Sequence, residues 1–135
     1  MAIWNDCYNS NPEAAESMID VLSRTPAARR IAVLGEMLEL GRASEALHRQ
    51  VGRYAAEHGV DALVGVRGGA RWMVEEALAR GLAADFFEDA AEAGRFARKL
   101  ARPGDAVLFK GSRGVRVERA LETFMEQAQS WEQRR

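Results

Sequence analysis

Short apolar runs alternate along the whole chain with longer stretches in which apolar residues recur every third or fourth position. Uninterrupted apolar runs at 31–34, 62–66 and 106–109 predict strands that are buried on both faces. Weaker runs at 3–4 and 84–87 predict two shorter strands. Helical spacing of apolar residues predicts helices over 12–24, 44–58, 70–78, 93–100 and 117–128. Strand and helix therefore alternate about five times.

Residues with strong positional preferences mark several of the expected helix ends. Asn11 followed by Pro12 indicates an N-cap and a first helical position, and Thr25-Pro26 ends that helix. Ser44 is expected to cap the second helix. Gly59 and Gly81 fit the C-terminal ends of the second and third helices.

This alternation predicts an α/β fold, with a three-layer, mostly parallel open sheet covered by helices on both faces. The pattern leaves open whether one strand runs antiparallel. A length of 135 residues with 47% apolar content suits a single domain with a substantial core. We find no linker or internal boundary, so residues 1–135 are expected to form one domain.

Charge and composition exclude several classes of function. The net charge is −1, which gives no basic bias toward nucleic acid. No apolar run is long enough to span a membrane, and the start lacks the pattern of a signal peptide. We therefore expect a cytoplasmic protein. One cysteine and two histidines ten positions apart predict no metal site.

Four loops follow predicted strands, at the edge where open α/β sheets bind ligands. They are 6–11, 35–41, 67–69 and 110–114. The first and last are rich in polar groups, and we expect them to form one site although they lie about a hundred positions apart in the sequence.

The first loop contains groups suited to a nucleotide. The Asp6 carboxylate could accept hydrogen bonds from ribose hydroxyls, the Tyr8 ring could stack on a base, and Asn9 and Asn11 could bond a purine edge. A turn followed by a capped helix is the alternative, and it accounts fully for Asn11 and Pro12.

The last loop offers two cations, a hydroxyl and backbone amides before a helix, from Lys110, Ser112 and Arg113. These groups suit a carboxylate or a phosphate. Lys110 is one of two lysines among 19 cationic residues, which is a weak sign that a compact ammonium is wanted there. A solvated turn is the alternative, and we favour the anion site.

The second loop is unusually apolar and acidic. Glu36, Met37 and Leu40 could line a pocket or contact a partner domain, or they could form a helical turn on the core, and both interpretations stay open. At Gly68-Gly69 a plain tight turn is favoured over an anion site, and His48 is interpreted as a structural histidine. The chain has no phosphate loop, no Ser-His-Asp set and no carboxylate pair for Mg²⁺, so it contains parts of a site without catalytic residues of its own.

Four segments together resemble the C-terminal domain of Mur ligases, and within that family the ligases that add D-alanyl-D-alanine to UDP-N-acetylmuramoyl-tripeptide. They occur in the family's order and cover most of the chain: Asp6–Pro12, Val33–Gly41, Leu47–Gly52 and Gly104–Gly114. Ser10 stands where the family often has Ala, and Glu36 where it often has Asp. Both departures are mild.

The resemblance implies an ATP-dependent ligase in peptidoglycan precursor synthesis. It implies a domain that closes over ATP and positions the dipeptide, while separate domains hold the UDP-sugar peptide, the phosphate loop and most Mg²⁺ ligands. Two residue sets follow from it: Asp6, Tyr8, Asn9 and Asn11 for ATP, and Lys110, Ser112, Arg113, Glu36, Met37 and Leu40 for D-alanyl-D-alanine. The alternative is a free-standing α/β module that binds a nucleotide, an anion or another protein.

Overall fold

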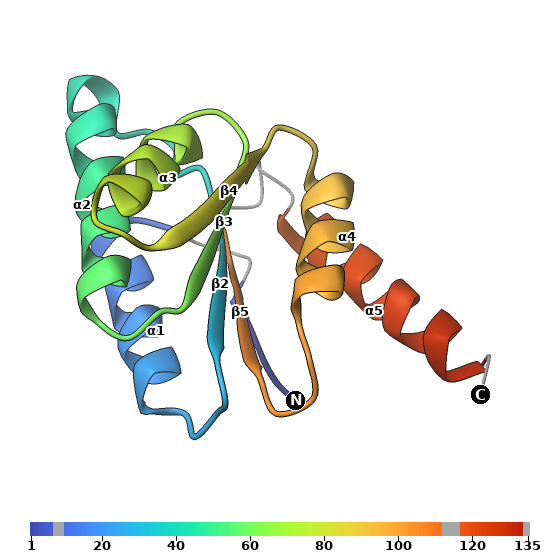
Figure 1. The fold of residues 1–135 in the computed structure, drawn as a ribbon. Helices are drawn as coiled ribbons and strands as arrows, with labels where there is room; N and C mark the ends of the chain where they lie inside the picture. Colours follow the sequence, from blue (N-terminus) through green and yellow to red (C-terminus); the bar gives the residue numbers. More distant parts are fainter. Residues whose placement is uncertain (7–9, 112–116, 134–135) are drawn as a thin grey trace.

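Five parallel strands form one sheet in the computed structural model, in the order β1-β5-β2-β3-β4 (Figure 1). The structure describes residues 1–6, 10–111 and 117–133, with side chains as far as residue 126. The strands are β1 (Ala2–Asp6), β2 (Arg30–Gly35), β3 (Ala62–Val66), β4 (Ala83–Phe87) and β5 (Ala106–Lys110). The expected α/β sheet is confirmed, and none of these five strands is antiparallel.

Helices cover both faces of the sheet. They are α1 (Pro12–Arg24), α2 (Ser44–Glu57), α3 (Ala70–Ala79), α4 (Ala90–Leu100) and α5 (Val117–Gln133), with a short 3₁₀ turn η1 (Gly41–Ala43) before α2. Helices α1, α2 and α3 pack on one face, and α4 and α5 on the other (Figure 1). The expected three-layer arrangement is therefore confirmed.

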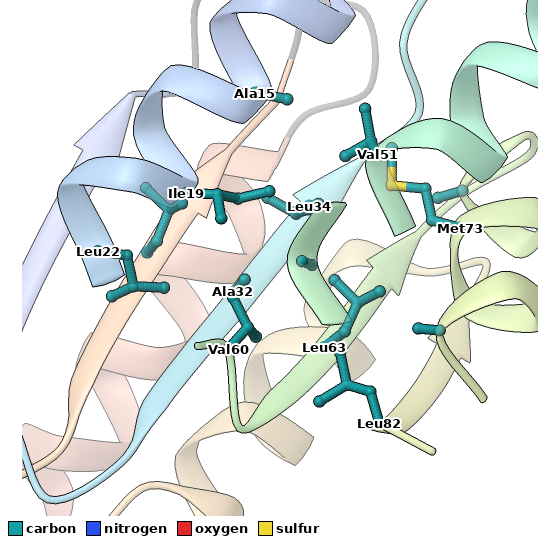
Figure 2. Close-up of a cluster of buried hydrophobic side chains, with 14 of the residues drawn as sticks. Ala15, Ile19, Leu22, Ala32, Leu34, Val51, Val60, Leu63, Met73 and Leu82 are labelled. Carbon is teal, nitrogen blue, oxygen red and sulfur yellow. The ribbon is translucent and has the colours of Figure 1, made fainter. Parts of the chain in front are cut away.

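Each face of the sheet has its own apolar core. One core joins β2, β3 and β5 to α1, α2 and α3 through residues such as Ile19, Leu34 and Met73 (Figure 2). The other joins the same strands to α4 and α5 through Val64, Phe109 and others. Strands β3 and β5 are buried along their whole length, as their uninterrupted apolar runs predict, whereas the edge strands β1 and β4 are partly exposed.

The predicted ends of α1 are confirmed, but the predicted cap of α2 is wrong. The Asn11 side chain accepts a hydrogen bond from the Ala14 amide at 2.8 Å, and the helix ends at Arg24, before Thr25. Ser44 is instead the first residue of α2, with helical backbone angles, and Ala43 holds the cap position. The 3₁₀ turn at 41–43 leads the backbone directly into the helix, so no extended residue remains to act as a side-chain cap.

Three residues that the sequence placed in loops are strand ends. Asp6, Gly35 and Lys110 are the last residues of β1, β2 and β5. Asp6 is in register with Lys110, and the Gly111 amide continues the ladder by donating to the Asp6 carbonyl at 3.2 Å. The sheet therefore fixes the backbone directly beneath the predicted site.

Within the part of the chain that the structure describes, every helix is too short or too polar to cross a lipid bilayer.

Candidate functional site

The carboxyl end of β5 lies at a point where the chain changes direction around the sheet. Strands β1 and β2 flank β5 and lead into α1 and α2 on one face, whereas β5 leads into α5 on the other face. Open α/β sheets bind ligands where neighbouring strands lead to opposite faces in this way. The residues that end β1, β5 and β2 are therefore the candidate site.

Asp6 and Lys110 form an ion pair at this point. The Lys110 Nζ lies 2.8 Å from the Asp6 Oδ2. The Lys110 side chain is 2% exposed and that of Asp6 is 39% exposed. A buried ammonium needs a charged or strongly polar partner, and Asp6 supplies one while keeping part of its carboxylate open to solvent. The two strand ends that lead into the loops expected to form one site thus meet through their charged side chains.

Glu36 joins the second and third loops at the same edge. Its Oε2 accepts a hydrogen bond from the Gly69 amide, at the start of α3, at 2.7 Å. Its own amide donates to the Val66 carbonyl at 3.0 Å. The sequence favoured a plain turn at Gly68-Gly69. The Gly69 amide does bind an anion, but that anion is the Glu36 carboxylate of the same chain.

The Met37 side chain belongs to the core, as one of the two interpretations of its loop expected. Its side chain is 2% exposed and packs in the core between the sheet and α1–α3, and Leu40 packs partly buried against that core. Leu38, between them, is 40% exposed. The segment therefore turns over the core, with Leu38 and Glu39 exposed and Glu36 partly buried.

His48 is structural, as expected, although it is more deeply buried than the sequence suggested. The side chain is fully buried, and its Nε2 accepts a hydrogen bond from the Met37 amide at 2.9 Å. Burial lowers the pKa of the imidazole below its ordinary value of 6.5, against the opposing effects of the Ser44 carbonyl and the Glu36 charge.

The remaining predicted residues divide into one that is described and four that are not. The Asn11 side-chain oxygen caps α1, as its alternative interpretation required. Tyr8, Asn9, Ser112 and Arg113 lie outside the described residues.

Sequence reasoning missed two contacts, Asp6 with Lys110 and Glu36 with the Gly69 amide. All four residues were placed at the correct edge of the sheet. The strand order brings them together, and no sequence signal predicts that order.

A second surface feature of the described residues lies away from this edge. A shallow depression of about 450 Å³ lies between the C-terminal halves of α2 and α3, lined by Ala56, Glu57, Glu76, Ala79 and Arg80. It contains none of the predicted site residues. Among the residues that the structure describes, no three His, Cys, Asp or Glu side chains gather in a way that could hold a metal ion.

Solved structures with the same fold include MurF ligases. MurF from Acinetobacter baumannii superposes with a TM-score of 0.80 and 31% identity, over 89% of this chain and 27% of that protein. MurF from Thermotoga maritima, solved in complex with ADP, gives a TM-score of 0.77 and 29% identity over 92% of this chain and 28% of that protein.

Sequence comparison leads to the same group. The UDP-N-acetylmuramoyl-tripeptide–D-alanyl-D-alanine ligase of Mycobacterium leprae is 34% identical over 134 residues, covering 85% of this chain and 26% of that ligase. The chain thus spans about a quarter of the length of such relatives. Residues 1–113 match the family model described as Mur ligase, glutamate ligase domain. The chain belongs to the Mur ligase family, in which it corresponds to the C-terminal domain.

Proposed function

We propose that this chain is the C-terminal domain of an ATP-dependent ligase that adds D-alanyl-D-alanine to UDP-N-acetylmuramoyl-tripeptide in the cytoplasm. Family membership and the activities for which the relatives are named support the proposal. The observation that carries it is the Asp6–Lys110 pair, a buried ammonium and a half-exposed carboxylate where β1 and β5 end side by side. The pair puts a cation and an anion at one edge, where each would serve to recognise a substrate.

The two charges suit different substrates. Asp6, with Tyr8, Asn9 and Asn11, would face the ribose and base of ATP, since a carboxylate accepts hydrogen bonds from ribose hydroxyls. Lys110, with Ser112 and Arg113, would hold the dipeptide carboxylate by charge. Glu36, Met37 and Leu40 would flank the dipeptide, Met37 through its backbone because its side chain lies in the core.

The domain would act by positioning. ATP phosphorylates the terminal carboxylate of the tripeptide, and the dipeptide amine attacks the acyl carbon. An amide bond forms, phosphate leaves, and the amine loses a proton. By fixing the far end of the dipeptide, Lys110 would aim its amine at that carbon.

The groups that activate ATP are expected on other domains of the ligase. The side chains of the described residues do not gather a set of Mg²⁺ ligands. From the resemblance to the family, we expect the metal and the phosphate loop on a central domain, and the UDP-sugar peptide on an N-terminal domain.

A pair of measurements tests the proposal. In the full-length ligase that contains this chain, phosphate release should require both D-alanyl-D-alanine and the UDP-sugar tripeptide. Calorimetry on the 135-residue chain alone should give weak ATP binding, with a Kd of about 1 mM or more, because the phosphate loop would lie on another domain. The chain alone should hydrolyse no ATP.

Two results would contradict the proposal. Phosphate release that is indifferent to D-alanyl-D-alanine would exclude the dipeptide as the substrate. Binding of ATP by the isolated chain with a Kd of about 1 μM would instead favour a free-standing nucleotide-binding module.

A further inference from the structure

The buried imidazole of His48 connects three parts of the candidate edge. His48 lies one turn into α2, and its Nδ1 lies 2.7 Å from the Ser44 carbonyl oxygen. Its Nε2 accepts from the Met37 amide at 2.9 Å. A carbonyl can only accept and an amide can only donate, so the proton must be on Nδ1 and the lone pair on Nε2. The two partners therefore require the neutral ring in one tautomer.

The same ring is packed against the start of α3. A Cβ atom added at Gly69 would lie 2.7 Å from the imidazole Cε1, so this position leaves no room for a side chain. The Trp72 ring lies 5.9 Å from the imidazole, centroid to centroid. The Gly69 amide in turn donates to Glu36. His48 thus contacts both the segment that carries Glu36 and the helix start that holds the Glu36 carboxylate.

The charged groups near the ring do not offset the effect of its burial. Glu36, on the loop after β2, favours the protonated form, but burial outweighs it and lowers the pKa. On α2 the neighbouring Arg49 is paired with Glu45 and with Glu75 of α3. Protonation would place a second N–H on Nε2, facing the Met37 amide donor, and the hydrogen bond would be lost.

We propose that His48 is a positioning residue, whose neutral imidazole holds the Met37 amide and thereby fixes the segment Glu36–Leu40 against the incoming dipeptide. The inference rests on the proposed function, because that function assigns the segment to the dipeptide. Met37 follows β2, and β2 is the neighbour of β5 with Leu34 in register with Lys110. Release of the Met37 amide would therefore loosen the segment next to the Lys110 ammonium.

Steady-state kinetics of the full-length ligase, measured from about pH 8 to about pH 5, tests this role. We expect the KM for D-alanyl-D-alanine to rise about three- to tenfold as pH falls through the pKa of His48, which burial places below the ordinary 6.5. The KM for ATP should change by less than about twofold, because Glu36–Leu40 does not face the nucleotide in the proposed arrangement.

Two glutamine variants separate His48 from every other ionisation. A Gln side chain can offer its Oε1 to the Met37 amide but cannot take a proton. His48→Gln should therefore keep a low dipeptide KM near pH 8 and lack the part of the acid rise that comes from His48. His58, at the other end of α2, stacks on Tyr54 and is the matched control, since His58→Gln should leave the rise in place. Ionisation of the substrates is common to all three proteins and cancels in the comparison.

Failure of the positioning role can be told apart from failure of the proposed function. An acid rise in His48→Gln as large as that in the unmodified enzyme, or equal acid effects on the two KM values, would overturn the positioning role while ligation continued. Absence of D-alanyl-D-alanine ligation by the unmodified enzyme at about pH 8 would overturn the proposed function itself. Nitrogen-15 spectra of the 135-residue chain give an independent check: His48 should be neutral with its proton on Nδ1 at pH 7, and a protonated ring would contradict the inference.

Discussion

Individual buried polar residues in this domain are held by specific partners. Asp105 is 2% exposed and lies 2.8 Å from the Arg29 Nη2. It also accepts a hydrogen bond from the Arg102 amide at 2.9 Å. Burial would raise the pKa of Asp105, but the Arg29 hydrogen bond and the Arg102 amide outweigh it, and the pKa is lowered. The loop before β5 is therefore tied to the start of β2.

Removing this carboxylate should destabilise the fold. Asp105→Ala leaves the Arg29 guanidinium and the Arg102 amide without their acceptor, and we expect a loss of about 2–3 kcal/mol in the free energy of unfolding by urea. Glu122→Ala, which breaks an exposed pair with Arg119, is the control and should cost less than about 0.5 kcal/mol. Equal losses in the two variants would show that the buried pair contributes no more to the free energy of unfolding than the exposed pair does.

The Asp105 contribution should also depend on pH. Its pKa is lower in the folded chain than the ordinary 3.8, so the unfolded chain binds the proton first. The stabilisation is complete above pH 3.8 and declines as pH falls through the folded pKa. In Asp105→Asn this part of the acid dependence should be missing.

At the scale of residues, the sequence predicted the character of single side chains better than the contacts that they make. The structural character of His48 could be inferred from neighbouring residues, whereas the binding of a ligand anion by Lys110 stays a prediction. Their partners Met37 and Asp6 could not be inferred, because these contacts cross between segments whose spatial order the sequence does not give. Asn11 was predictable because its cap contact is local, three residues along the chain.

At the scale of elements, α4 and α5 pack with their backbones in close approach at Gly94. A Cβ atom there would collide with the Ala120 carbonyl of α5 and would lie 2.9 Å from the Thr123 Cβ. Gly94 lies in the middle of α4, where glycine otherwise weakens a helix. Its presence is therefore explained by the packing of the two helices and not by helix propensity.

Gly94→Ala should push these helices apart. Although alanine is the better helix former, we expect a loss of about 1–3 kcal/mol in unfolding free energy from the forced displacement. Arg95→Ala, at the next position on the exposed side of α4, is the control and should stay within about 0.5 kcal/mol of the parent. A stabilised Gly94→Ala protein would show that α5 can move away at no cost.

Element types were well predicted because the buried strands and amphipathic helices have different periods. The boundaries near the site were less well predicted. Asp6 and Lys110 are polar, and their polarity suggested loop, but pairing between neighbouring strands keeps both in the sheet. The prediction that Ser44 caps α2 was wrong because a 3₁₀ turn precedes the helix. Short turns of this kind leave little trace in the hydrophobic pattern.

At the scale of the whole molecule, the strand order β1-β5-β2-β3-β4 brings the residues of the candidate site together. Inserting β5 between β1 and β2 brings Lys110 into register with Asp6 on one side and with Leu34 on the other. Because the loops after β1 and β2 lead to one face and the loop after β5 to the other, the edge between them is left for ligands. Alternation of strands and helices predicted the sheet, but it could not predict that the last strand lies second in it.

The kinetic effect of replacing Lys110 in the full-length ligase decides whether this edge binds the dipeptide. Lys110→Met keeps most of the buried volume and leaves Asp6, which is 39% exposed, in contact with water. We predict a KM for D-alanyl-D-alanine that rises about 10- to 100-fold, as for a lost charge-assisted hydrogen bond, with the KM for ATP within about twofold of the parent. Lys99→Met, at the other lysine of the chain, should change neither. Equal effects of Lys110→Met on both substrates, or none on the dipeptide, would contradict the assignment of this edge.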